Sequence, residues 1–130
     1  MSSFRYLLVL SIAGLAAASS IAARRPAPHP VDLTTVRKNL TDLRTAEEKY
    51  FLIHNAYTGN VSSLEMTVTD SVTIKFTESS TQAYAVSGTV KGNTTTSCVM
   101  FVGGVTAIPK TEKGTQAKAE GGVLCDGDPI

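Results

Sequence analysis

A periodic stripe of apolar residues near the middle of the chain constrains its fold more than any other feature. The residues of the stripe recur at steps of three and four, which places them on one side of an α-helix, whereas a strand would require alternation. A single helix cannot bury such a stripe alone, so the chain that follows must cover it. The stripe consists of Leu33, Val36, Leu40, Leu43, Ala46, Tyr50, Ile53 and Tyr57.

The opposite side of the predicted helix is charged. Two ion pairs are expected between residues four positions apart, Lys38 with Asp42 and Arg44 with Glu48. Each such pair contributes only about 0.2–0.5 kcal/mol, so the apolar stripe matters more. The remaining charges on this side are Arg37 and Lys49.

The predicted helix has recognisable borders. Asp32 is expected to be the N-cap, with the first turn starting at Leu33. The helix is expected to end near Asn55, because the residues 57–60 that follow have the composition of a turn.

The first 23 residues have the layout of a secretory signal peptide. Arg5 supplies a positive charge before the apolar run Leu7–Ala18, and small residues follow it. The candidate cleavage points follow Ala18, Ala22 and Ala23. The alternative is a retained membrane anchor formed by residues 7–23, whose length stands at the lower limit of about 17 residues for a bilayer span. We expect an exported protein, periplasmic or extracellular, and favour cleavage over retention.

A proline-rich spacer, residues 24–31, separates this leader from a single domain over residues 32–130. Its prolines disfavour helical geometry in the residues before them, so the spacer should be extended. Removing the leader takes away Arg5 and leaves 11 basic and 11 acidic residues. That balance does not indicate binding to nucleic acid or to an anionic membrane surface. Contact with a membrane is expected only if the N-terminal segment is retained.

Three segments of alternating apolar and polar residues follow the helix and predict an antiparallel meander. They are Asp70–Glu78, Gln82–Val90 and Ser97–Val102. The short links between them are typical of hairpins. Three such strands present an apolar face wide enough for the stripe of the helix, which indicates the α+β class.

The last third of the chain carries weaker signals. Val105–Ile108 is expected to be a short edge strand, and Lys110–Ala119 an exposed loop. Gly121–Asp126 should then return the chain to the sheet. In an exported chain the pair Cys98 and Cys125 is expected to form a disulfide that pins this return, whereas two free thiols would suit a cytosolic protein.

This order of elements resembles the headgroup of type IV pilins and pseudopilins. The closest part is Asp42–Glu65, which contains Tyr50-Phe51 and then Tyr57-Thr58-Gly59. The blocks SCVMFVGG and GGVLCD also resemble the Cys-bearing strand and the tail of that family. The resemblance covers Val31–Asp126 and implies a long N-terminal helix packed on a meander of three to four strands. It also implies a structural or adhesive role and protein partners in the cell envelope, such as pilus or secretion-system components.

The N-terminus departs from the family. A pilin precursor has a Gly at its cleavage point and then Phe-Thr-Leu-Ile-Glu, which opens the helix that assembles the filament. Here Gly14 is not followed by Phe, and Leu7–Ala23 contains no Glu. We therefore expect a soluble or singly anchored relative rather than a major filament subunit.

Catalytic, cofactor and metal sites are not expected. His29 stands between prolines, His54 stands at the helix end, and the adjacent Glu47 and Glu48 are expected to be ordinary solvated charges. Asp126-Gly127-Asp128 offers too few ligands for a calcium loop. The sequence thus favours a non-enzymatic protein that works through its surfaces. The alternatives are a small periplasmic ligand-binding or inhibitor-like module without any tie to filaments and, less favoured, a hydrolase.

Overall fold

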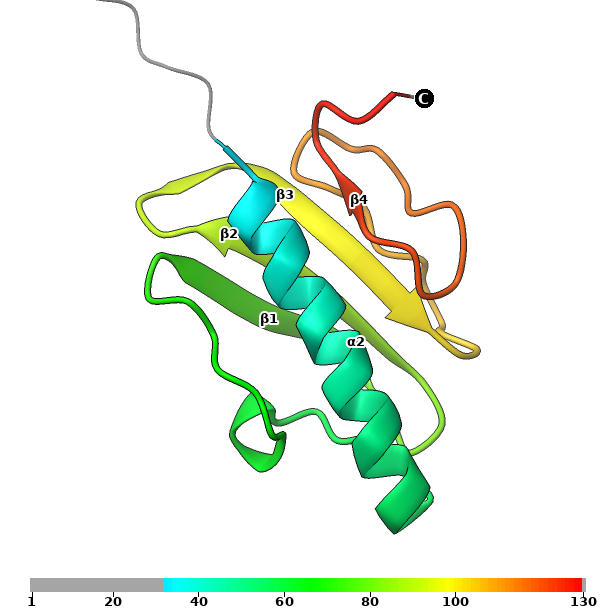
Figure 1. Ribbon diagram of the computed structural model, residues 1–130. Helices are drawn as coiled ribbons and strands as arrows, with labels where there is room; N and C mark the ends of the chain where they lie inside the picture. Colours follow the sequence, from blue (N-terminus) through cyan, green and yellow to red (C-terminus); the bar gives the residue numbers. More distant parts are fainter. Residues whose placement is uncertain (1–31, 130) are drawn as a thin grey trace, which may run out of the picture. The chain divides into compact units, whose positions relative to one another are not determined.

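The computed structural model describes residues 32–129, which form one helix packed on a four-stranded antiparallel sheet (Figure 1). The α+β class is therefore confirmed. The helix α2 spans Thr34–His54, well inside the chain rather than at its N-terminus, and is followed by the single 3-10 turn η1, Val61–Ser63. The strands are β1 (Val72–Ser79), β2 (Tyr84–Val90), β3 (Asn93–Val102) and β4 (Leu124–Cys125), and they lie in the order β1-β2-β3-β4.

The predicted leader and spacer, residues 1–31, lie outside the described residues. Within residues 32–129, no helix combines the length and the apolar character that a bilayer crossing requires.

The apolar stripe of α2 is buried as predicted over most of its length. Val36, Leu40 and Leu43 have no exposed surface, and Ala46 is 5% exposed. Ile53 was expected to belong to the stripe but is 78% exposed. The last turn of α2 extends past the sheet, so nothing covers that residue (Figure 1). The sheet side of the core consists of Val72, Tyr84, Val86, Cys98, Met100, Val102 and Cys125.

The two ends of α2 differ in how well they were predicted. The N-cap is Leu33, not Asp32, and Leu33 makes no side-chain cap bond. Asp32 stands one residue earlier, where its Oδ1 accepts the N–H of Thr34 at 2.9 Å. Hydrogen bonding to the side chain of Thr34 and then to its backbone lowers the pKa of Asp32. At the other end, Asn55 adopts a left-handed conformation and its N–H donates to the Phe51 carbonyl at 2.7 Å. That cap ends the helix where the sequence predicted.

The three long strands form a regular meander. Val86 of β2 lies opposite Phe76 of β1 and Met100 of β3, so that apolar side chains meet under the helix. β3 begins at Asn93, earlier than the predicted Ser97, because it extends by pairing with β2 although its first residues are polar. β4 pairs with β3 at only two positions.

The face of the sheet opposite α2 is partly covered by the chain between β3 and β4. Val99 points to that face and is fully buried, and residues 107–110 lie against it. The predicted strand Val105–Ile108 is wrong, because these residues form bends without ladder bonds. The predicted exposed loop Lys110–Ala119 is partly wrong as well, since Thr111 and Ala117 are each 4% exposed. The segment is tied to the sheet by the N–H of Glu112, next to Thr111, which donates to Oγ of the buried Ser97 in β3 at 2.9 Å. Local polarity does not reveal this contact.

Gly88 in β2 sets how closely the helix can approach the sheet. A methyl group at this position would come within 2.6 Å of Val36 Cγ1. We expect Gly88→Ala to lower the free energy of unfolding by about 1–3 kcal/mol, because the helix must move outward. Urea denaturation measures the change. The matched control is Gly104→Ala, where the added methyl meets nothing within 4 Å. Equal stabilities of the two variants would show that α2 can move away from Gly88 without a loss of stability.

Candidate functional site

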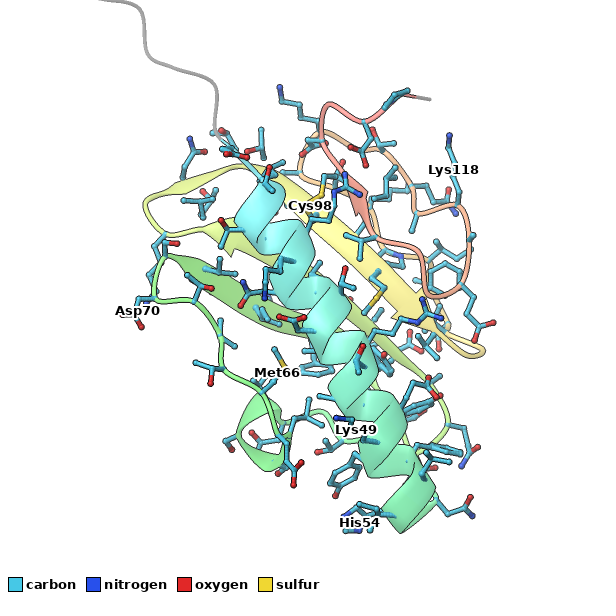
Figure 2. All side chains as sticks on the ribbon, in the orientation of Figure 1. Lys49, His54, Met66, Asp70, Cys98 and Lys118 are labelled. Carbon is cyan, nitrogen blue, oxygen red and sulfur yellow. A yellow bond between two sulfur atoms is a disulfide. The ribbon has the colours of Figure 1, made fainter. Side chains whose placement is uncertain are left out.

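The disulfide predicted from the sequence is present. Cys98 of β3 and Cys125 of β4 lie opposite each other in the register and are bonded through their sulfurs, 27 positions apart in the chain. Both residues are buried at the edge of the core under α2. The bond therefore fixes the C-terminal segment onto the sheet (Figure 2).

The acidic residues after Cys125 turn inward and bind the protein itself. Asp128 receives two hydrogen bonds from Nη2 of Arg37, one of them at 2.6 Å, and a third from the N–H of Cys125 at 2.9 Å. Asp126 accepts the N–H of Ser97 at 2.9 Å. These contacts secure the end of the chain, although Oδ1 of Asp126 is buried without a hydrogen-bond partner among the described residues. Among residues 32–129, no three or more His, Cys, Asp or Glu side chains come together as metal ligands would.

The Arg37–Asp128 pair predicts a measurable loss of stability when it is removed. The two side chains are 41% and 25% exposed, so solvent screens the pair, and we expect Asp128→Asn to cost on the order of 1 kcal/mol at neutral pH. Hydrogen bonds from Arg37 and Cys125 lower the pKa of Asp128. The difference from the wild type should therefore disappear only in strong acid, when the carboxyl is protonated.

A matched control for that measurement is Asp42→Asn, which breaks the exposed Lys38–Asp42 pair at 2.8 Å. This expected pair is formed, whereas Arg44 of the second expected pair donates instead to the Gly121 carbonyl at 3.1 Å. Chemical denaturation should show at most about 0.5 kcal/mol for the control. A larger loss of stability in Asp42→Asn than in Asp128→Asn would contradict the conclusion that the Arg37–Asp128 pair holds the C-terminal segment in place.

Glu47 was predicted to be solvated, and this prediction is wrong. Its side chain has no exposed surface and lies inside the core among apolar groups. Its Oε2 accepts the N–H of Thr58 at 3.1 Å, while Oε1 has no hydrogen-bond partner among the described residues. Burial raises the pKa of Glu47 to about 7, and the nearby charge of Glu48 acts in the same direction. The bond from Thr58 opposes the rise.

Aromatic rings near this buried acid join the end of α2 to the sheet. Tyr57 packs edge-on against Tyr84, with ring centroids 5.0 Å apart, and Tyr57 also contacts Phe51 at 4.6 Å. The hydroxyl of Tyr84 is buried and unpartnered within residues 32–129, and burial together with the charge of Glu47 raises the pKa of Tyr84. Because neither Glu47 nor Tyr84 has exposed surface, neither side chain can contact a substrate.

The spacing of the apolar residues in the sequence indicates the burial of Glu47. Val36, Leu40 and Leu43 are followed by Glu47 at the same spacing of three and four, so Glu47 falls on the apolar stripe itself.

Three asparagines, Asn39, Asn60 and Asn93, stand in the Asn-x-Ser/Thr pattern of glycosylation acceptors. Burial excludes the first of them as an acceptor. Asn39, in the first of them, is 1% exposed, and its Oδ1 accepts the N–H of Thr69 at 2.9 Å. Its Nδ2 donates to the Thr35 carbonyl at 2.8 Å, so the amide is not accessible to a modifying enzyme. Asn60 directly precedes η1 and Asn93 is the first residue of β3, and the Oδ1 of each asparagine accepts bonds from the residue two positions on.

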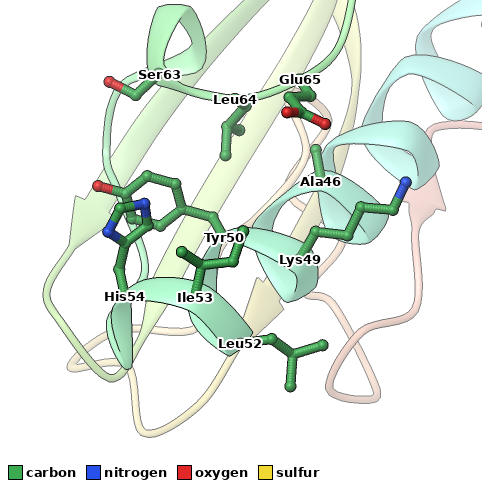
Figure 3. A pocket seen from close by; sticks show the side chains of 9 residues that line it. All are labelled: Ala46, Lys49, Tyr50, Leu52, Ile53, His54, Ser63, Leu64 and Glu65. Carbon is green, nitrogen blue, oxygen red and sulfur yellow. The ribbon is translucent and has the colours of Figure 1, made fainter.

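An open groove lies between the end of α2 and the segment around η1 (Figure 3). Its volume is about 340 Å³. Ala46, Tyr50 and Leu64 supply apolar surface, and the ring of His54 stacks on Tyr50 with centroids 4.1 Å apart. His54 is exposed and is the last residue of α2, in agreement with its predicted place at the helix end. His29 lies outside the described residues. The groove is lined by Ala46, Lys49, Tyr50, Leu52, Ile53, His54, Ser63, Leu64 and Glu65.

The sequence did not predict this groove, because Ile53 follows the period of the apolar stripe although it is exposed. Two consecutive apolar residues directly before the helix end, Leu52 and Ile53, were the available signal. Chemically the groove can bind an apolar group between two oppositely charged side chains, Lys49 and Glu65. No protein-family model matches the sequence, and a search of curated proteins found no relative.

Proposed function

We propose that this protein is an exported, non-enzymatic structural or interaction protein related to the headgroups of type IV pilins and pseudopilins. One observation carries the proposal: a long helix lies across an antiparallel meander whose last strand is held by a disulfide. This is the order of elements that the sequence resemblance implies for that family. A disulfide also suits the oxidising compartments outside the cytosol.

The surface of the domain agrees with a role through contacts. The titratable groups with strongly perturbed environments, Glu47 and Tyr84, are sealed in the core, where they can act on stability but not on a ligand. By contrast, Leu52 and Ile53 expose apolar surface beside an open groove. Apolar side chains that protrude together on a soluble surface are typical of sites where proteins meet. We propose partners in the cell envelope.

The experiment that tests the proposal follows export and disulfide formation in the native host. The full chain, carrying a C-terminal tag, should be recovered outside the cytosol with both cysteines oxidised. A variant lacking residues 7–18 should stay in the cytosol with free thiols. Mass spectrometry of the mature N-terminus then shows whether cleavage follows Ala18, Ala22 or Ala23 or whether the segment is retained as an anchor. Recovery of the full chain in the cytosol with reduced cysteines would refute the proposal.

A second candidate function is a small ligand-binding module, which the volume of the groove favours. At about 340 Å³ the groove stands at the lower end of the sizes that hold small molecules. Saturable binding of an apolar fluorescent probe that Leu64→Asp abolishes would support this candidate, provided that the variant keeps its circular dichroism spectrum. If the probe does not bind, the ligand-binding candidate is excluded and the interaction role remains as the proposal.

A further inference from the structure

The end of α2 carries the two most exposed large apolar side chains of the described residues. Leu52 is 84% exposed and Ile53 is 78% exposed, and within residues 32–129 the one other large apolar residue in this class is Ile108, at 39%. Figure 3 shows Leu52 pointing away from the other residues of the groove, as a protruding group. Burying each of these side chains would contribute about 1.5–3 kcal/mol of free energy, so their exposure favours binding to a partner.

A complementary hollow lies directly beside this protruding group. Ala46 and Leu64 are 5% and 7% exposed, and together with Tyr50 they form its apolar wall. The groove has room for a leucine-sized side chain, because its volume is about 340 Å³. The same patch thus holds both a protruding side chain (the knob, Leu52) and a hollow that can accept one (the hole).

The charges of the groove are also self-complementary. Lys49 and Glu65 both line the groove, one from α2 and one from the segment after η1 (Figure 3). The ion pairs formed among residues 32–129 are Arg37–Asp128 and Lys38–Asp42, so Lys49 and Glu65 are not paired with each other. Opposite charges on one patch can pair when two identical patches face each other in opposite orientations.

We infer that this patch binds a second copy of the chain across a two-fold axis, with Leu52 of each copy in the groove of the other. Lys49 of one copy then faces Glu65 of its partner, and the contact occurs twice. A two-fold interface requires that a single surface be complementary to itself, and a knob, a hole and two opposite charges on one patch meet that requirement. The inference is independent of the proposed export and of the family resemblance.

The dimer should be weak on its own. The patch consists of only the last turns of α2 and a short facing segment, so we expect a contact smaller than the roughly 800 Å² per partner of a stable interface. We expect a dissociation constant on the order of 0.1–1 mM, which corresponds to about 4–5.5 kcal/mol. Such an affinity matters where copies are concentrated, for example on a surface or in an assembly.

Sedimentation velocity of the disulfide-bonded protein over a concentration series tests the contact. The wild type should shift from monomer toward dimer as the concentration approaches the millimolar range. Leu52→Asp should remain monomeric, and because Leu52 is exposed the substitution leaves the core intact. Ile108→Asp, which alters the other exposed apolar residue, should associate like the wild type. A monomeric wild type at millimolar concentration, or association that Leu52→Asp leaves unchanged, would overturn the inference.

A charge exchange then separates contact between molecules from contact within one molecule. Lys49→Glu and Glu65→Lys should each weaken self-association, because each variant alone opposes like charges twice across the two-fold axis. An equimolar mixture of these two variants should associate again, since every pair in the mixed dimer joins a carboxylate to an ammonium group. No interaction within one chain predicts that recovery. Association lost in both variants and not regained on mixing would rule out the two-fold arrangement.

Discussion

Replacing Glu47 by glutamine is expected to raise the free energy of unfolding by on the order of 3 kcal/mol at pH 8, and by less than about 1 kcal/mol at pH 5. Burial raises the pKa of Glu47 from 4.5 to about 7, so the folded protein holds the proton more tightly than the unfolded chain does. Each pKa unit corresponds to about 1.36 kcal/mol. Glutamine has the same shape and carries no charge to bury.

The sign of the pH dependence follows from this raised pKa. Below about pH 4.5 the carboxyl is protonated in both states, and its contribution to stability is fully present. As the pH rises toward 7, the unfolded chain ionises first and the wild type loses stability; above 7 the difference no longer grows. The charged and titratable groups around the site are Glu48 and Arg44 on α2, Tyr57 in the turn and Tyr84 on β2.

Urea denaturation at pH 5, 6, 7 and 8 measures this effect as a slope. The wild type should lose stability across this range, and Glu47→Gln should lose much less. Glu48→Gln is the matched control, since Glu48 is the adjacent exposed residue of the same helix, and a change within about 0.5 kcal/mol is expected. Parallel pH profiles for the wild type and Glu47→Gln would show that the buried carboxyl does not titrate differently in the folded state.

Removing the disulfide is expected to have the other large effect. The bond closes a loop of 27 positions, and in the chain-entropy model this stabilises the folded state by about 3–4 kcal/mol. The double variant Cys98→Ala with Cys125→Ala should lose at least this amount, because both residues also lie in the core. For a domain of this size the melting temperature should fall by more than about 10 °C.

The loss should be concentrated in the C-terminal segment. β4 keeps only two paired positions with β3, so amide hydrogen exchange should accelerate first near Leu124 and Cys125. The amides of β1 and β2, which pair over most of their lengths, serve as the internal control. Equal melting temperatures for the wild type under oxidising and reducing conditions would contradict the stabilising role of the bond.

The parts of the fold predicted correctly from the sequence are those that short-range patterns determine. Val36, Leu40 and Leu43 repeat with the period of a helix, and they are buried. Alternation identified the three long strands to within a few residues of their bounds, apart from the early start of β3. The cysteine pair correctly predicted the return of the chain to the sheet.

The incorrect predictions concern residues whose surroundings come from distant parts of the chain. Ile53 follows the helical period but stands beyond the sheet, whereas Glu47 is charged yet lies over Tyr84. Thr111 and Ala117 are buried, which no pattern in their own segment indicates. The candidate groove depends on where Leu64 passes the helix end, and that path is likewise set by tertiary packing.

The bond between β3 and β4 also determines what a protease can release from this protein. Lys113 and Gly114 are exposed between the two cysteines, so trypsin can cut the backbone there. Because Cys98 and Cys125 stand on opposite sides of the cut, the two fragments stay covalently joined and the nicked product gains the mass of one water molecule. Only a reducing agent would then set the C-terminal fragment free.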